Sequence, residues 1–244
     1  MDMAILLTDF EKHLYSQFKE DGITNKIFET IGVTNKFYLD FGATENTNNS
    51  EFLHKHQGWT GILWNGKSFP NCYTKIHQEY ITVENVVELC KKYNIPEEID
   101  LLSIDIDGND WHVWREISKA VKPRVVIIEY NSSFPPCDDR VMPYNPNWSW
   151  DGYNYYGATI TAMYNLGRHL GYSLVSAEGY GGVNLFFVRD DIQPEKYFKG
   201  VNDVEFLYRP PHFGTTYPYT NPPYGHPHDF KNRPWQKSID LLNQ

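Results

Sequence analysis

The sequence predicts an α/β fold built on a mostly parallel sheet that ends in an antiparallel hairpin. Short apolar runs bounded by glycine or polar turns alternate with segments of helical period, which is typical of successive strand–helix units. The last two apolar runs, Tyr172–Ala177 and Val183–Arg189, are joined only by the turn EGYGG and predict the hairpin. At 244 residues, 41% of them hydrophobic, the chain can form one large domain of this class or two small ones.

The N-terminal segment Thr8–Asp21 predicts an amphipathic helix. Thr8 and Glu11 form a capping-box pattern, in which each side chain satisfies a free backbone N–H of the first turn. Apolar residues follow at four-residue spacing, namely Phe10, Leu14 and Phe18. We expect this helix to cover an edge or the mouth of the sheet, without a chemical role.

The first strand–helix unit begins with Lys36–Gly42, a strand that carries Asp40 near its carboxyl end. A polar stretch and the helical segment Glu51–His56 follow. A strand, a glycine turn and a helix start form the layout of a nucleotide-binding unit, in which free N–H groups of the helix face a ligand. A single glycine also fits any ordinary strand–helix turn, so this signal is weak.

The second strand, Gly58–Gly66, closes with the turn pair Asn65-Gly66. In nucleotide-binding folds an acid at this point commonly holds ribose hydroxyls. Asn65 can still donate to and accept from a hydroxyl, but it lacks the strength that charge gives such a bond. Residues 67–81 leave little room for a crossover helix, whereas Thr82–Tyr93 has the apolar spacing of a helix and stops before Pro96.

The central stretch Ile99–Asp110 is an apolar run closed by three carboxylates, Asp105, Asp107 and Asp110. Strand alternation predicts that Ser103, Asp105 and Asp107 share one face. Buried charges are costly unless they are paired or bind a metal, and open α/β sheets bind ligands at the carboxyl ends of their strands. We therefore expect Asp105 and Asp107 to face a site. The alternative is a solvated turn, which explains Asp-Gly-Asn well but Asp105 poorly.

After a predicted helix at Trp111–Ala120, the next buried strand, Pro123–Asn131, also ends in polar groups. Glu129 and Asn131 are one residue apart and are therefore expected on one face. The oxygen-rich set Asp105, Asp107, Glu129 and Asn131 suits Mg or Mn. The alternative for Glu129 is a salt bridge to an arginine such as Arg124 or Arg140.

A long loop rich in Pro, Trp and Tyr covers residues 131–156, and a helix at Ala158–Leu170 that ends at Gly171 follows it. Its aromatic residues can stack on a sugar or a cofactor, or equally pack over the sheet edge: Trp148, Trp150, Tyr153, Tyr155 and Tyr156. From Tyr197 onward the chain is proline-rich and irregular. His226 and His228 lack a third metal ligand at suitable spacing, so exposed imidazoles are the better interpretation.

The bulk composition narrows the function classes. A net charge of −9 argues against a general nucleic-acid binder but allows a sugar substrate. The three cysteines are an odd number without metal-ligand spacing, which indicates free thiols in a reducing compartment, and we expect a cytoplasmic location. The sequence has no apolar run long enough to span a membrane, and the N-terminal AILL is too short for a signal-peptide core.

Five stretches taken together resemble the FkbM-type S-adenosylmethionine-dependent methyltransferases: GWTGILWNG, TVENVVEL, IPEEIDLLSIDIDGND, RVVIIEYN and YYGATITAM. The resemblance covers about Lys36–Arg189 and is most specific at IDLLSIDIDGND. It implies the Rossmann-like class I methyltransferase fold, with a seven-stranded, mostly parallel sheet, a terminal antiparallel hairpin and helices on both faces. We expect one domain, with residues 1–35 as a helical cover, 36–190 as the α/β core and 191–244 as an irregular tail.

The resemblance also implies S-adenosylmethionine as cofactor and methyl transfer to a hydroxyl of a sugar or glycan. Carried over residue by residue, it predicts a cofactor site, whereas the chemistry of the residues themselves predicts a catalytic site and an acceptor site. The cofactor set is Asp40, Gly42, Ala43, Asn46, Asn65 and Asp105, where Asn46 replaces a usual glycine and Asn65 the ribose-binding acid. The catalytic set is Asp105, Asp107 and Glu129, which either remove the hydroxyl proton directly or act through Mg or Mn held by Asp107, Glu129 and Asn131. The acceptor set is Trp148, Trp150, Tyr155 and Tyr156.

Two other functions compete with this one. The departures at Asn46 and Asn65 favour a catalytically silent methyltransferase-like domain that binds a glycan or a protein partner. A nucleotide-sugar enzyme of the dinucleotide-binding type is disfavoured because the chain has no GxGxxG motif.

Overall fold

A computed structural model describes residues 4–45, 47–69, 74–212 and 225–244. One seven-stranded sheet runs through the molecule in the order β3-β2-β1-β4-β5-β7-β6. Its strands are β1 (Phe37–Phe41), β2 (Thr60–Asn65), β3 (Ile76–Gln78), β4 (Glu98–Ile104), β5 (Lys122–Glu129), β6 (Tyr172–Ala177) and β7 (Asn184–Arg189). Strands β1 to β5 pair in parallel, and β7 lies antiparallel to both β5 and β6. The predicted class I methyltransferase-like fold is thereby confirmed.

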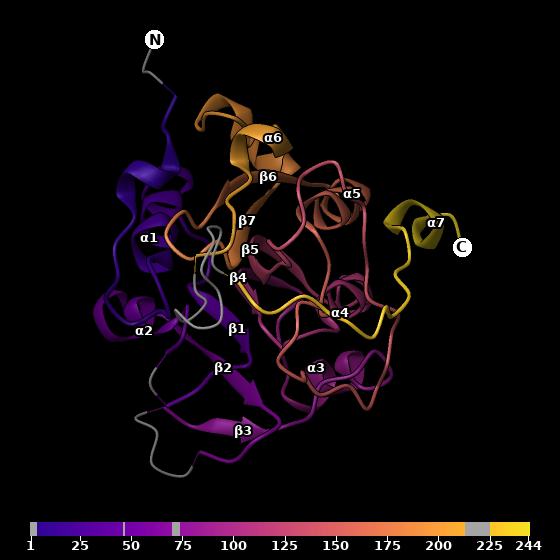
Figure 1. Ribbon diagram of the computed structural model, residues 1–244. Coiled ribbons are helices and arrows are strands. Elements are labelled where there is room, and N and C mark those ends of the chain that lie inside the picture. The colour runs from indigo at the N-terminus through magenta and orange to yellow at the C-terminus, as the bar shows by residue number, and fades with distance from the viewer. Residues whose placement is uncertain (1–3, 46, 70–73, 213–224) are drawn as a thin grey trace.

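Helices cover both faces of the sheet (Figure 1). The helices of one face are α1 (Glu20–Ile31) and α2 (Glu51–Gln57), and those of the other are α3 (Val86–Lys92), α4 (Asp110–Ile117) and α5 (Ile160–Leu170). Alternate residues of each central strand enter the two resulting cores, because successive side chains of a strand point to opposite faces. Tyr38 and Leu101 pack with α1 and α2, whereas Leu39 and Leu102 pack with α3 to α5.

The predicted helix at Thr8–Asp21 is wrong in its position. The structure has a short 3-10 helix, η1 (Leu7–Phe10), then irregular chain, and α1 begins only at Glu20. Asp21 explains the difference, because its Oδ2 accepts hydrogen bonds from the backbone N–H groups of Leu14, Tyr15 and Ser16 at 2.7–2.9 Å. A carboxylate that gathers successive N–H groups holds them in a turn and competes with a helix.

The structure adds one strand to those that the sequence placed and ends two others earlier. Residues 67–81 contribute the edge strand β3, which the sequence did not predict; no helix is described between β2 and β3. Strand β4 ends at Ile104, and Asp107 has a left-handed backbone with φ of 57°, so strand alternation does not extend from Ser103 to Asp107. Similarly, β5 ends at Glu129, and Asn131 lies in the loop beyond it.

The C-terminal segment returns across the molecule to the α5 side. It contains α6 (Val204–Leu207) and α7 (Ser238–Leu242), and Figure 1 shows it passing over the sheet end before it reaches α7 beside α5. Val141 and Gln236 pair through reciprocal backbone hydrogen bonds of 2.8 and 2.9 Å, which fix the tail to the long loop. The described part of this segment thus combines short helices with irregular chain and is bound to the core.

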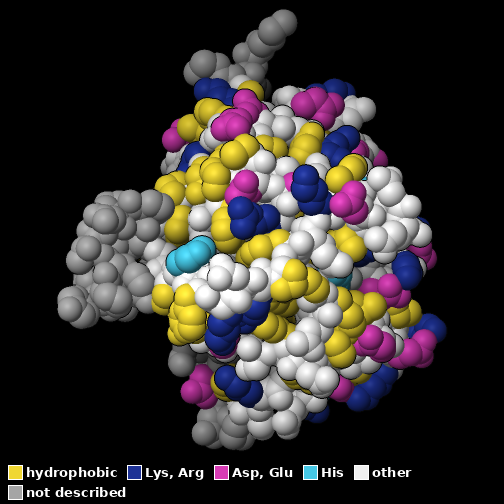
Figure 2. All heavy atoms as spheres, turned by 45° about the vertical axis from the view of Figure 1, so that its right-hand side comes forward, with side chains coloured by type: hydrophobic (Ala, Val, Ile, Leu, Met, Phe, Trp, Pro, Cys, Tyr) yellow, Lys and Arg dark blue, Asp and Glu magenta, His cyan; other side chains and the backbone are white. Residues whose placement is uncertain are grey.

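The described surface mixes charges of both signs. On the face drawn in Figure 2, Lys and Arg side chains are interspersed with Asp and Glu and with apolar groups, rather than gathered into one basic field. None of the helices in the described ranges combines the length and the apolarity that a membrane crossing needs.

Candidate active site

A cleft of about 610 Å³ opens at the carboxyl ends of β1, β2 and β4. Strand β1 lies between β2 and β4, so the chain order reverses there, and open α/β sheets bind ligands at such a point. The volume falls within the roughly 300–1,000 Å³ of small-molecule sites. Polar residues from the strand ends line it together with aromatic residues of the long loop, including Asp40, Asn65, Asp105, Asp107, Trp148 and Trp150.

Gly42 shapes the floor of the cleft. Its backbone is left-handed, with φ of 78°, and a Cβ placed on it would lie 1.7 Å from the carbonyl oxygen of Asp105. The loop after β1 therefore touches the backbone at the end of β4, an approach that only glycine permits. Ala43 follows as a buried residue at 2% exposure. The predicted cofactor residues Gly42, Ala43 and Asp105 are thus brought together.

Asp40 lies at the cleft, but its carboxylate is used by the chain itself. Its Oδ2 accepts hydrogen bonds from the Ser50 hydroxyl at 2.7 Å and from the Ser50 N–H at 3.2 Å. These bonds attach the start of α2 to β1. Burial raises the pKa of Asp40 to about 6, and the Ser50 bonds act in the opposite direction.

Asn65 is committed in the same way. Its Nδ2 donates to the carbonyl of Ala43 at 3.0 Å, and its Oδ1 accepts from the N–H of Lys67 at 2.8 Å. The side chain therefore ties the loop after β1 to the turn after β2 while it lines the cleft. Asn46, the remaining predicted cofactor residue, lies outside the described residues.

The turn after β4 is held by Asp110 at the start of α4. One carboxylate oxygen accepts from the N–H of Ile106 at 2.9 Å and the other from the N–H of Gly108 at 2.8 Å. This turn has the Asp-Gly-Asn chemistry of the alternative interpretation, and Asp110 serves it. Asp107 takes part in this turn through its left-handed backbone, but no described hydrogen bond or ion pair involves the carboxylate of Asp105 or of Asp107.

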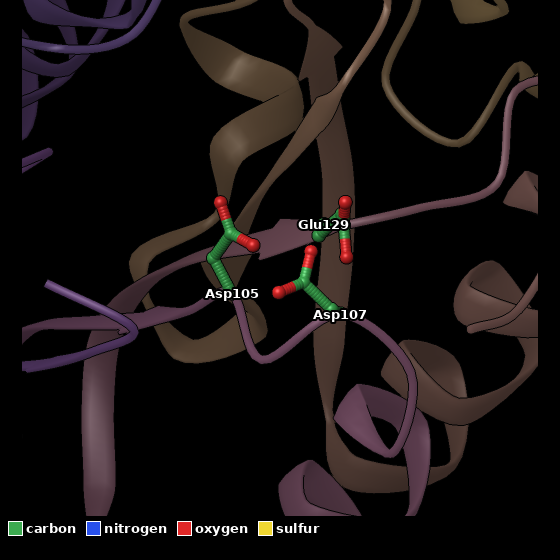
Figure 3. A group of neighbouring side chains, drawn as sticks. All are labelled: Asp105, Asp107 and Glu129. Atoms are coloured by element: carbon green, nitrogen blue, oxygen red, sulfur yellow. The ribbon is translucent and has the colours of Figure 1, made fainter. Parts of the chain in front are cut away.

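Asp105, Asp107 and Glu129 converge where β4 and β5 end. One carboxylate oxygen of each lies within 4.8 Å of those of the other two, and Figure 3 shows the three side chains turned toward one another. Burial, and then the charges of neighbouring acids, raise the pKa of Asp105 and of Glu129 well above their usual range. Although the Asp107 side chain reaches the surface, desolvation of its carboxylate by the protein atoms around it also raises its pKa, against the lowering effect of Lys67.

The alternative role of Glu129 as an ion-pair partner is wrong. Arg124 pairs with Asp100 at 3.1 Å, and Arg140 pairs with Asp138 at 2.9 Å. The Oε2 atom of Glu129 is buried and has no hydrogen-bond partner. Burying an ionised oxygen without a partner is costly, so a ligand or a proton must compensate it.

Asn131, predicted to join this group, is used elsewhere. Its Nδ2 donates to the carbonyls of Asn154 and Tyr156 at 2.8 and 2.9 Å, and its Oδ1 accepts from the N–H of Ser133 at 3.1 Å. The fully buried amide therefore anchors the aromatic loop to the end of β5.

The four predicted acceptor residues separate into two pairs. Trp148 and Trp150 line the cleft, and the Trp148 Nε1 donates to the carbonyl of Asp107 at 2.8 Å. Tyr155 and Tyr156 are buried, at 5% and 3% exposure, and the Tyr155 hydroxyl donates to the carbonyl of Pro234. Packing, the alternative weighed for this loop, therefore describes Tyr155, whereas the two tryptophans face the cavity.

Asn184, at the start of β7, was missed by sequence reasoning. It lines the cleft and lies directly opposite Glu129 in the antiparallel register. Its Nδ2 donates to Glu20 at 2.9 Å, but its buried Oδ1 has no partner. The sequence does place a polar residue, Asn184, at the start of the otherwise apolar hairpin strand NLFFVR. The local sequence does not show that Glu129 lies opposite it in the sheet.

Residues 10–174 match the family model described as the Methyltransferase FkbM domain, which is more than half of the chain. None of the curated proteins matches the chain.

Proposed function

The chain belongs to the FkbM methyltransferase family, and on that premise we propose that it methylates a hydroxyl group of a sugar or glycan. The observation that carries this proposal is the group of carboxylates at Asp105, Asp107 and Glu129, which have no hydrogen-bond or ion-pair partner among the described residues. They lie beside a cleft at the reversal point of the sheet. Methylation of a hydroxyl requires a group that accepts its proton.

The residues around the loop after β1 fit the family's cofactor, S-adenosylmethionine. Gly42 leaves the space that a Cβ would fill, and the cleft beyond it is large enough for a nucleoside. The backbone of Gly42 and Ala43 would hold the cofactor from the β1–β2 side, where the side chain of Asn65 lines the cleft. When bound, S-adenosylmethionine supplies an electrophilic methyl group.

The carboxylates would receive the proton of the acceptor hydroxyl. Asp107 is the exposed member of the group, so its oxygens meet an incoming hydroxyl first. A general base works best when its pKa lies near the working pH, and burial moves the pKa of Asp107 in that direction. The rigid turn set by Asp110 keeps this oxygen in a fixed position, which favours in-line alignment.

The acceptor class is supported by the aromatic wall. Trp150 is 38% exposed and lines the cleft with Trp148, so both can offer an apolar ring face to a sugar. The Trp148 carbonyl also accepts from the Tyr80 hydroxyl at 2.8 Å, which joins this wall to the segment after β3. Sugars, with both apolar faces and hydroxyls, suit such a wall beside carboxylates.

One observation favours the second candidate, a catalytically silent domain that binds a glycan or a protein. Oδ2 of Asp40 and both polar atoms of Asn65, two residues expected to meet the cofactor, already bond to other parts of the chain. Titration calorimetry with S-adenosylmethionine and with its demethylated product separates the two functions. Saturable binding of either is expected, whereas no binding at millimolar cofactor would favour the silent domain.

Acceptor chemistry is tested by transfer of a labelled methyl group to a panel of sugars. An ether linkage of the label distinguishes hydroxyl methylation from methylation of a carboxylate, which gives a base-labile ester, and from methylation of carbon or nitrogen. We expect an ether that resists mild base. A label found only on nitrogen or carbon would contradict the hydroxyl acceptor while leaving the methyltransferase assignment unaffected.

A further inference from the structure

We infer that Asp105, Asp107, Glu129 and Asn184 form a binding site for a divalent cation of the Mg²⁺ or Mn²⁺ type. The site draws its side chains from the turn after β4, the end of β5 and the start of β7. Binding of the ion does not depend on the proposed reaction, although its use in methyl transfer does.

The spacing of the carboxylates fits one ion. Ligand oxygens bind such cations at about 2.0–2.6 Å, so two ligands of one ion lie at most roughly 5 Å apart. An oxygen of Asp105, of Asp107 and of Glu129 all lie within 4.8 Å of one another. Figure 3 shows the three carboxylates converging on a common region from two segments of chain.

Among the described residues, no ion pair compensates the charges of the group. No described salt bridge includes Asp105, Asp107 or Glu129, and Lys67 influences only Asp107. Carboxylates at this distance cannot all remain ionised unless a cation or shared protons neutralise them. A divalent ion would neutralise two of the three charges at once.

Asn184 provides an observation independent of the acidic group. Its side chain is 1% exposed, and Oδ1 has no hydrogen-bond partner. Opposite residues of an antiparallel pair point to the same face, so Asn184 points to the side of Glu129, its register partner, and it lines the cleft with Asp105. Because Nδ2 is held by Glu20, the oxygen is the atom left for a ligand. A cation in this position would satisfy the buried amide oxygen.

The donor set identifies the class of ion. All four residues offer oxygen, and no histidine or cysteine joins the described group, which selects Mg²⁺ or Mn²⁺ over Zn²⁺ or Cu²⁺. Asp107 is exposed in the cleft, so the remaining coordination positions face the space where the acceptor would lie. A cation there would lower the pKa of an acceptor hydroxyl and orient a sugar diol.

Binding is measured on the full-length chain without cofactor or acceptor. After removal of metal with a chelator, MnCl₂ is titrated while the spectrum of free Mn²⁺ is followed by electron paramagnetic resonance, and MgCl₂ is used to displace it. We expect one saturable site. The variants Asp107→Asn, Glu129→Gln and Asn184→Ala should each weaken it at least about tenfold, since ligand charge and number set affinity. Glu195→Gln, an exposed acid on η3 (Pro194–Lys196), is the matched control and should bind as the wild type does.

Thermal unfolding distinguishes a variant that has lost metal binding from a variant that does not fold. In chelator, Asp107→Asn and Glu129→Gln should unfold at a higher temperature than the wild type, because each relieves repulsion among the carboxylates. In millimolar MgCl₂ the order should reverse, since only the wild type gains stability from the ion. Absence of saturable Mn²⁺ binding in the wild type, or equal binding by the wild type and all three variants, would overturn the site. Failure of this test leaves the proposed function open, because that function is measured by cofactor binding.

Discussion

The two sides of the cleft differ in how their polar side chains are used. On the side of β1 and β2, Asp40 bonds to Ser50, and Asn65 joins Ala43 to Lys67. On the side of β4 and β5, Asp105, Asp107 and Glu129 have no such partners in the described structure. Both sets lie at strand ends in one cavity region, so location alone does not explain the difference.

The difference indicates that the polar side chains of the two sides have different roles. Hydrogen bonds within the chain fix the loops that shape the side proposed for the cofactor, and a side chain used in this way has a structural role. A buried carboxylate without a partner destabilises the protein, and such groups are retained where they bind or react. We therefore expect substitutions on the first side to affect stability, and substitutions on the second side to affect the reaction.

The largest expected effect comes from a substitution on the side of β4 and β5. Asp107→Asn keeps the shape of the side chain and removes its charge, so turnover should fall about a hundredfold to ten-thousandfold whether Asp107 is a base or a cation ligand. Rates with a labelled methyl donor measure this, and Glu195→Gln controls for the loss of one negative charge.

A chelator distinguishes a role of Asp107 as a base from a role as a cation ligand. Loss of turnover in chelator and its recovery with Mg²⁺ or Mn²⁺ would assign the group to a cation, whereas chelator-insensitive turnover would leave direct proton removal. Wild-type rates in both Asp105→Asn and Asp107→Asn would show that these carboxylates are structural, and the contrast between the two sides would be lost.

The next effect tests the wall that Gly42 forms. Gly42→Ala would place a Cβ 1.7 Å from the Asp105 carbonyl, so we expect a loss of unfolding free energy of about 3 kcal/mol or more, with weakened cofactor binding. Gly32→Ala is the matched control, because Gly32 has a similar φ of 71° but open space around its Cβ. Denaturant unfolding of both variants separates the clash from backbone strain. Equal destabilisation would mean that the close approach to β4 contributes nothing.

Asp40, on the side of β1 and β2, should make the stability of the protein depend on pH. Its pKa is raised to about 6 in the folded protein, against about 3.9 when unfolded, so the folded state holds its proton to higher pH. The Asp40 carboxyl therefore contributes about 3 kcal/mol to the free energy of unfolding below about pH 4. This contribution is lost as the pH rises to about 6. Asp40→Asn retains an oxygen for Ser50 and should lack this decline. Parallel stability curves of variant and wild type between those pH values would contradict the assignment.

The sequence predicted the elements that local pattern determines. Thr82–Tyr93 overlaps α3 and Pro123–Asn131 overlaps β5, because apolar period and proline positions are local signals. It failed at Thr8–Asp21, where one carboxylate outweighs a good helical pattern, and at β3, which is only three residues long.

For the site, sequence reasoning found the carboxylates but not all of their neighbours. Asp105, Asp107 and Glu129 were recognised because charges interrupt buried strands, and the structure brings them together. Asn131 carried the same signal yet serves the aromatic loop, since a polar residue at a strand end does not reveal its bonding partners. Asn184 became visible only through the register of β5 with β7, a contact between residues 55 positions apart.

The smallest expected effect concerns the aromatic wall, through Arg233 of the C-terminal tail. Its guanidinium lies 4.2 Å from the Tyr155 ring centre and 5.6 Å from that of Trp148, and it pairs with Asp151 and Asp229. A point substitution tests the tail more cleanly than deletion, because deletion would also remove the Pro234 carbonyl that binds Tyr155.

Arg233→Met keeps much of the side-chain length and removes the charge, so the cation–π contacts and both ion pairs are lost. Cation–π contacts and ion pairs near the surface contribute about 0.5–1 kcal/mol each, which predicts a rise of severalfold in KM for the acceptor. Cofactor affinity should change much less, because Arg233 does not line the cleft on the side of β1 and β2.

Lys231→Met is the control, since Lys231 also pairs with Asp151 but lies over Tyr153 instead of Trp148. Equal KM values for the two variants would indicate that the tail acts through Asp151 alone, and an unchanged KM in both would remove Trp148 from the acceptor wall.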